Sequence, residues 1–148
     1  MIVQAVKVVL EESELAAQVR AALGAVSQLK EVTFGLVPGA VIVGGKFQLG
    51  FAIPFETQWT VEVLEQGLRL GVRLAHVSVG LIGMSASMVS SQVMAALAQK
   101  LQGVPGMAVE NDAIMLDPAV VLASKGVRLE AQVKRISVLQ GCVEVEAG

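Results

Sequence analysis

The side chains that most often carry out catalysis are scarce in this chain of 148 residues, which has one His, one Cys, one Trp and no Tyr. His76 and Cys142 cannot complete a metal site together, because a protein zinc site usually has three or four such ligands. Glu110, Asp112 and Asp117 could be imagined around calcium, but their spacing is not that of an EF-hand loop. A solvated turn followed by a helix N-cap explains these acids better. The sequence therefore predicts no metal site.

Three short segments resemble parts of known catalytic or phosphate-binding motifs. Gly44-Gly45-Lys46 lacks the earlier glycine of a phosphate loop, and Phe47 stands where that loop has Ser or Thr. Gly83–Ser87 resembles part of a nucleophile elbow, but Ser87 replaces the second glycine and the only His precedes it. Ser27-Gln28-Leu29-Lys30 matches Ser-x-x-Lys at a helix end, without the companion motifs. We predict close packing within a strand for the glycine pair, helix capping for the serines, no catalytic residue and no cofactor.

The composition favours an extensive apolar interior. Hydrophobic residues make up 54% of the chain and charged residues only 16%, against about 45–50% and 25% in typical domains. A chain this apolar hides more surface than a compact core needs, or presents some of it to a partner, a lipid or a cavity. The net charge is −2, and only Lys134-Arg135 are adjacent basic residues. Nucleic-acid binding is therefore not expected.

The cysteine content, the length of the apolar runs and the first ten residues predict the cellular compartment. Cys142 is the only cysteine, so it forms no disulfide within the chain and suits a reducing compartment. No apolar run approaches the ~18 residues of a membrane span. The first ten residues lack the basic start and cleavage site of a signal peptide. We predict a cytoplasmic protein, or an envelope-associated one if an export signal was removed.

Hydrophobic periodicity divides the chain into strands and helices within one domain, residues 1–148. Residues 2–10 read as a strand, and a helix follows, capped by Ser13 and closed at Gly24, with an apolar stripe. From Val32 to Val79 the period changes to two, which is typical of half-buried antiparallel strands. Pro38-Gly39 and residues 65–67 supply turns, and a slip of phase at Ala75-His76-Val77 indicates a bulge.

The second half predicts one long helix and a closing sheet. Residues 85–102 form an apolar helix that begins at Ser85 or Ser87 and ends at Gly103; we expect the sheet to wrap around it. Asn111-Asp112 turns a short hairpin, and Asp117-Pro118 starts a short helix. Two strands close the domain, residues 127–136 and 138–146. The predicted fold class is α+β, with a curved antiparallel sheet wrapped around a long apolar helix and a second, N-terminal helix.

Several segments of this pattern resemble the LmeA-like lipid-binding proteins of bacterial envelopes, within the tubular lipid-binding (TULIP) superfamily. The resemblance covers most of residues 12–146 and consists of glycines, turns and apolar alternation. It implies a long helix cradled by a curved sheet, with an aliphatic groove that binds lipid. Such proteins usually carry an export signal or membrane anchor, and none is found in this chain. The resembling segments are residues 36–45, residues 53–56, residues 67–70, the helix start at Ser85 and residues 111–117.

We therefore expect a non-enzymatic module that binds a lipid or another apolar molecule, with possible peripheral membrane contact. The alternative is a structural module whose apolar surface and strand edges form a homo-oligomer, such as a homodimer. Met84, Met88, Met94, Met107 and Met115 suit either an adaptable pocket or an irregular core. The residues expected to line the ligand groove are Val19, Leu23, Phe47, Phe55, Trp59, Val89, Val93, Leu97 and Leu101.

Overall fold

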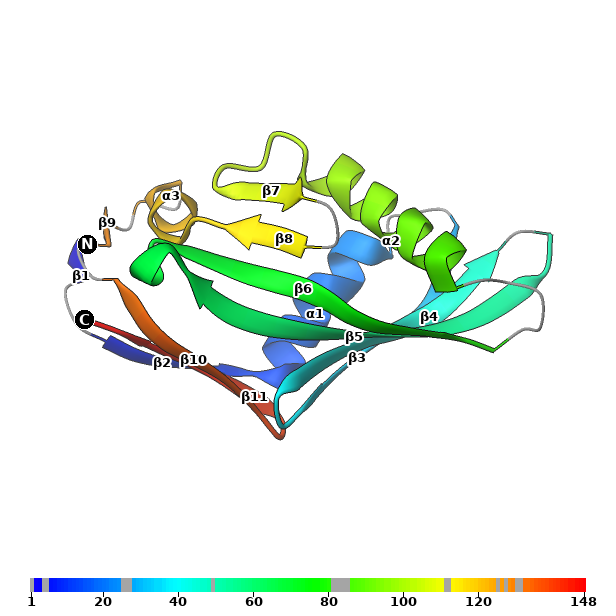
Figure 1. The fold of residues 1–148 in the computed structure, drawn as a ribbon, viewed down its shortest axis with the longest axis horizontal. Helices are drawn as coiled ribbons and strands as arrows, with labels where there is room; N and C mark the ends of the chain where they lie inside the picture. Colours follow the sequence, from blue (N-terminus) through cyan, green and yellow to red (C-terminus); the bar gives the residue numbers. More distant parts are fainter. Residues whose placement is uncertain are drawn as a thin grey trace.

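The protein has an α+β fold built mainly from antiparallel sheets, which confirms the predicted fold class at that level (Figure 1). The computed structural model describes residues 2–3, 6–24, 28–48, 50–80, 86–110, 113–124, 126, 128–129 and 132–148. The predicted helix start at Ser85, the turn at Asn111-Asp112, and Ser27, Gly83 and Met84 lie outside the described residues.

The largest sheet has six antiparallel strands in the order β3-β4-β5-β6-β8-β7. Pro38-Gly39 joins the first two strands, and the 3-10 turn η1 (Glu65–Gly67) joins β5 to β6, as predicted. The register between β5 and β6 shifts where Gln58 faces His76 and Trp59 faces Leu74, which confirms the bulge. The strands span β3 (Leu29–Val37), β4 (Ala40–Gln48), β5 (Ala52–Leu64), β6 (Arg69–Val79), β7 (Met107–Glu110) and β8 (Ala113–Leu116).

The two faces of this sheet differ because successive side chains of a strand point to opposite sides. On β5, Ile53, Phe55 and Trp59 are buried, whereas Glu56 and Thr60, at positions of the opposite parity, are exposed. We call the side that carries Phe55 and Trp59 the inner face. The alternation predicted from the sequence therefore places the core on this face.

A second sheet has the order β10-β11-β2, with β10 (Val133–Leu139), β11 (Cys142–Ala147) and β2 (Val6–Glu11), all antiparallel. A short parallel pair, β1 (Ile2–Val3) with β9 (Arg128–Leu129), lies apart from it. The predicted bounds of the two closing strands are wrong, because the turn falls at Gln140-Gly141 and not after Ile136. Gly141 has φ +78°, a conformation that glycine adopts at little cost.

Three helices complete the described fold: α1 (Glu12–Leu23), α2 (Ala86–Leu101) and α3 (Pro118–Ala123). The predicted cap at Ser13 is wrong, since α1 begins at Glu12 directly after β2. Asp117 caps α3 as predicted, accepting a hydrogen bond from the Val120 N–H at 3.2 Å. Within the described residues, no helix combines the length and the apolar character that crossing a membrane requires.

The prediction that the sheet wraps around a long apolar helix is wrong. The sheets do not curl around α2, which lies beside β6 and β7 and contributes buried side chains only on the side that faces the core (Figure 1). Its other sides expose Ser91, Gln92, Gln99 and Lys100. The helix is therefore a cover on one face of the six-stranded sheet, because its apolar stripe is narrower than its overall composition suggests.

The start of α1 joins the two larger sheets. The Leu36 backbone N–H donates to Oε1 of Glu12 at 2.6 Å, and the Leu36 carbonyl accepts from the Gly141 N–H at 3.3 Å. The Gly39 N–H donates to the Val138 carbonyl at 2.9 Å, so the β3–β4 turn is also bonded to the strand β10. These bonds occupy backbone groups of the edge strand β3 at Leu36, whose side chain is 1% exposed.

Substitution of Glu12 tests this junction. We expect Glu12→Ala to lower the free energy of unfolding by about 1 to 3 kcal/mol, because the N–H of a buried residue loses its acceptor. Glu14→Ala is the matched control, since Glu14 also lies in the first turn of α1 but is exposed. Urea unfolding measures both variants. Equal losses of stability in Glu12→Ala and Glu14→Ala would contradict the role of the Glu12–Leu36 hydrogen bond, because both variants remove a negative charge from the first turn of α1.

Candidate functional site

The inner face of the six-stranded sheet and the two longer helices enclose one apolar cluster. We call it the helix-side cluster. Phe47 on β4 and Phe55 on β5 stack at its centre with ring centroids 4.7 Å apart and an interplanar angle of 30°. The buried members, all 1–9% exposed, are Leu23, Leu29, Phe47, Ile53, Phe55, Trp59, Val93 and Met94.

Most of the residues predicted to line a groove meet in this cluster. Val19 and Leu97 pack against it as half-buried residues. Leu101 is half-buried at the last position of α2, and the side chain of Val89 lies outside the described part of the structure. The members that were predicted and are buried are Leu23, Phe47, Phe55, Trp59 and Val93.

The cluster contains residues that the prediction left out. Ile53 is 1% exposed and lies two residues before Phe55 on the same strand, so both side chains point to the same face. The period-two pattern therefore already indicated Ile53. Leu29 is 4% exposed and begins β3, but it lies between the predicted helix end at Gly24 and the start of the period-two pattern at Val32, so the pattern did not indicate it. Met94 was among the methionines that suit a core or a pocket, and it lies in the core.

One polar side chain, Thr57, lies within this apolar layer and is 0% exposed. Its hydroxyl Oγ1 donates to the Val43 carbonyl at 2.7 Å and accepts from the Trp59 indole Nε1–H at 2.8 Å. Thr57 therefore provides a hydrogen-bond partner for the only polar group of the Trp59 side chain. A buried indole N–H without a partner would be costly, so this contact fixes the orientation of Trp59.

A separate hollow of about 280 Å³ lies beyond this cluster, between β7, β8 and the start of α3. Its volume is just below the range of about 300–1,000 Å³ typical of small-molecule sites. Arg69 in its wall lies 3.5 Å from Glu65, and the Asp117 carboxylate caps α3. No predicted groove residue lines it, although two of the singled-out methionines do. The lining residues are Arg69, Gly106, Met107, Ala108, Glu110, Met115, Leu116, Asp117 and Val120.

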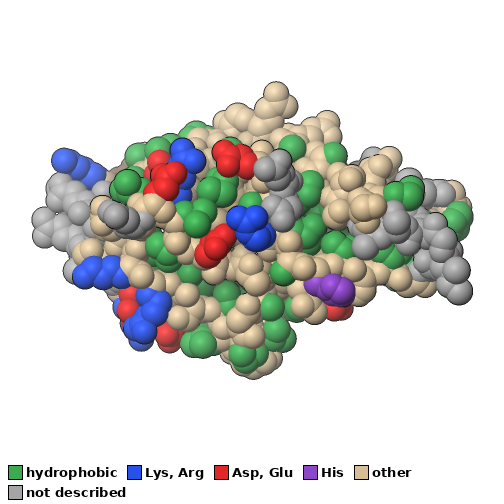
Figure 2. All heavy atoms as spheres, viewed as in Figure 1, with side chains coloured by type: hydrophobic (Ala, Val, Ile, Leu, Met, Phe, Trp, Pro, Cys, Tyr) green, Lys and Arg blue, Asp and Glu red, His purple; other side chains and the backbone are tan. Residues whose placement is uncertain are grey.

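The residues weighed for chemistry are dispersed. The single histidine, His76, is exposed and is visible at the surface in Figure 2. Within the described part of the chain, no three His, Cys, Asp or Glu side chains come close enough together to hold a metal ion. Ser87 lies in the first turn of α2.

The glycine pair Gly44-Gly45 lies inside β4, as the packing interpretation predicts. A Cβ atom on Gly44 would come within 2.8 Å of Thr33 Oγ1, and one on Gly45 within 3.0 Å of the Lys30 carbonyl. Lys46 forms an ion pair with Glu31 at 2.8 Å. These glycines therefore allow close approach of neighbouring strands and do not form a phosphate loop.

The fold and the cluster define an α+β protein of antiparallel sheets whose helices cover an apolar sheet face. Comparison of the chain with protein-family models, curated proteins and solved structures finds no match. The resemblance to LmeA-like proteins stays a prediction.

Replacement of Thr57 tests the buried hydrogen bonds. We expect Thr57→Val to lower the free energy of unfolding by about 1 to 3 kcal/mol, because the indole N–H loses its acceptor. Trp59 is the only tryptophan, so its N–H gives a single indole peak in a ¹H–¹⁵N NMR spectrum. That peak should shift and exchange faster with solvent in Thr57→Val.

Thr57→Ser is the matched control, because it keeps the hydroxyl and loses one methyl group. It should leave the indole peak near its original position. An unchanged peak in Thr57→Val would contradict the assigned hydrogen bond.

Proposed function

We propose that this protein is a non-enzymatic binding module that takes up an apolar, lipid-like molecule between α1, α2 and the inner face of the six-stranded sheet. The observation that carries the proposal is the convergence of both helix stripes on one aromatic and aliphatic sheet face. Val19 and Leu23 reach it from α1, and Val93 and Leu97 reach it from α2. Burial of alkyl chain on such a surface would contribute about 0.8 kcal/mol per CH₂ group.

The polarity of the cluster supports an apolar ligand over a polar one. Thr57 is the buried polar side chain among the described residues, and its hydroxyl is already bonded to Val43 and Trp59. Few hydrogen-bonding groups are left to recognise a polar head group of a ligand. We therefore expect the site to bind different apolar chains with little selectivity.

The cluster residues pack against one another, so ligand uptake requires α2 to move away from the sheet. Among its described side chains, only Val93 and Met94 are buried. Segments with few buried apolar contacts open at lower free-energy cost than the rest of a domain. Phe51 and Met88, which are 57% and 54% exposed, offer apolar contacts to a membrane surface from which a lipid could be taken. A cytoplasmic location remains part of the proposal, and the lone Cys142 fits it.

Quenching of Trp59 by a brominated stearic acid tests the site. Trp59 is the only tryptophan, is 4% exposed and lies in the helix-side cluster, so a bound bromine would quench its fluorescence at short range. We expect saturable quenching by the brominated acid, and displacement of the probe by unbrominated stearic acid. Native mass spectrometry with organic extraction would identify a ligand that co-purifies.

Two variants locate the bound chain. Leu97→Gln should weaken binding of the probe by about 1 to 2 kcal/mol, because α2 then presents an amide to the alkyl chain. Val120→Asp is the control, since Val120 is 42% exposed in the separate hollow. Circular dichroism checks that both variants are folded. Absence of quenching in the folded protein, or loss of binding only in Val120→Asp, would overturn the proposed site.

A further inference from the structure

Among the described strands, β2 is one of the two edges of the second sheet. It pairs with β11 on one side and is the last strand in the order β10-β11-β2. Val8 and Val9 point to opposite faces of this sheet, and they are 39% and 51% exposed. Apolar side chains exposed on both sides of an edge strand are typical of a strand that pairs with another chain.

The backbone groups on the open side of β2 follow from the ladder with β11. The Glu12 N–H donates to the Gly141 carbonyl at 2.9 Å, one position beyond the facing residues Glu11 and Cys142. In an antiparallel ladder, facing residues alternate between those that exchange both backbone hydrogen bonds and those that exchange none. Glu11 and Cys142 are therefore a pair that exchanges none. The same alternation leaves the N–H and C=O groups of Lys7, Val9 and Glu11 directed away from β11.

We propose that a second copy of this chain pairs with β2 across a two-fold axis at Val9, giving an antiparallel dimer with a continuous sheet. This register places Val9 opposite Val9 of the partner subunit, and it pairs every backbone group left open at positions 7, 9 and 11. It also places Lys7 opposite Glu11 of the partner subunit, twice by symmetry. A two-fold axis at Val8 or at Leu10 leaves these opposite charges unpaired, and an axis at Lys7 sets two lysines against each other.

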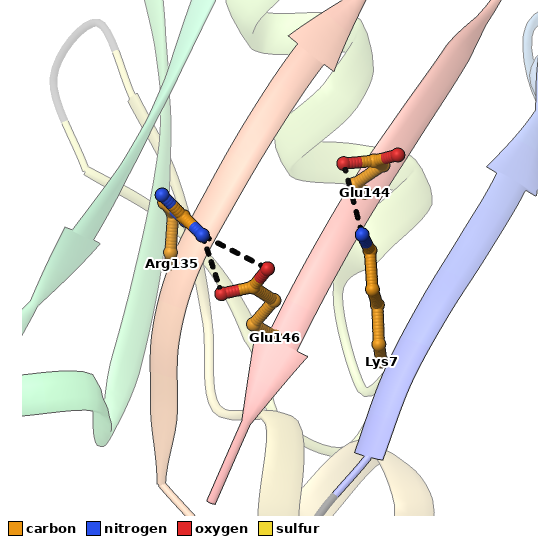
Figure 3. Close-up of polar contacts among 4 residues, drawn as sticks. All are labelled: Lys7, Arg135, Glu144 and Glu146. Carbon is orange, nitrogen blue, oxygen red and sulfur yellow. Dashed lines mark hydrogen bonds and ion pairs between the residues drawn. The ribbon is translucent and has the colours of Figure 1, made fainter.

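The charges on this face are arranged to accept such a partner. Figure 3 shows Lys7 reaching across to Glu144, with a separation of 3.7 Å between Nζ and Oε2, while Arg135 holds both carboxylate oxygens of Glu146 at 2.8–2.9 Å. The Lys7 side chain is still 56% exposed, and Glu11 is exposed at the other end of the strand. The dimer thus extends an existing row of alternating charge, and opposite charges on facing residues stabilise strand pairing.

Analytical ultracentrifugation of the full chain over a wide concentration range tests the dimer. We expect the wild-type protein to sediment as a monomer–dimer equilibrium and Val9→Lys to remain a monomer, because two lysines would face each other at the axis. Val9 is half-exposed and faces Glu144 across the ladder, so a lysine there is compatible with the folded monomer. Leu68→Lys is the control, since Leu68 is 56% exposed and lies at the end of η1, outside the second sheet.

A charge exchange tests the register. Glu11→Lys should raise the dissociation constant of the dimer roughly tenfold, because both cross-subunit pairs become repulsive. Adding Lys7→Glu should restore dimerisation. A wild-type chain that stays monomeric, a Val9→Lys variant that dimerises normally, or larger assemblies would overturn the proposal. Circular dichroism of each variant checks folding, and the result is independent of lipid binding.

Discussion

The fold depends on covering one apolar face of a long antiparallel sheet. Strands β5 and β6 run for 13 and 11 residues, and apolar side chains line the inner face of both, interrupted by Thr57 on β5 and by the bulge beside His76 on β6. Among the described helices the longest, α2, has 16 residues, and at about 1.5 Å per residue it is shorter than β5, whose 13 residues rise about 3.3 Å each. Two different covers share the inner face: α1 and α2 over Phe47, Phe55 and Trp59, and the second sheet over Leu36 and Val61. Removal of this face from water supplies the main driving force for folding.

The junction between the covers explains why the chain order matters. Glu12 follows β2 directly, so one residue both begins α1 and accepts the hydrogen bond of Leu36 on the edge strand β3. The second sheet is thereby tied to the first through covalent continuity and through the backbone bonds of Gly39 and Gly141. The edge of β3 is occupied by these contacts, whereas the edge of β2 faces outward. The edge of β2 therefore differs from that of β3, which is why we propose β2 as the edge that accepts a partner strand.

The sequence predicted the strands well because their signals are local. Period-two alternation and the turns at Pro38-Gly39 and Glu65–Gly67 define β4, β5 and β6, and a slip of phase located the bulge beside His76. The bounds of the closing hairpin were misplaced by a few residues, because β10 continues past Ile136 to Leu139 and β11 begins only at Cys142. The helix cap at Ser13 was wrong for a tertiary reason: α1 starts where β2 ends, and Glu12 is held there by Leu36.

The sequence predicted which residues meet at the candidate site, but not whether they line a cavity or fill a core. An apolar side chain at helical or strand spacing shows that a residue faces inward, but the same residue types line a cavity or fill a core. The structure brings Leu23, Phe47, Phe55, Trp59 and Val93 together and packs them closely. The prediction that the sheet wraps around the long helix was wrong for a related reason. The composition of a helix does not show how wide a stripe of its surface is buried. The position of Lys7 and Glu11 relative to an open edge could not be read from the sequence at all, because it depends on the ladder with β11.

The two proposals draw on different parts of the apolar excess. Ligand uptake needs the inner face under α2, where Val93 and Met94 are buried and few contacts resist opening. Dimerisation needs the exposed valines of β2, on the sheet that covers the opposite end of that inner face. A dimer through β2 would stiffen the second sheet and its bonds to β3 without touching α2. The proposed ligand uptake moves the cover that the proposed assembly leaves free, so the two proposals are compatible with each other.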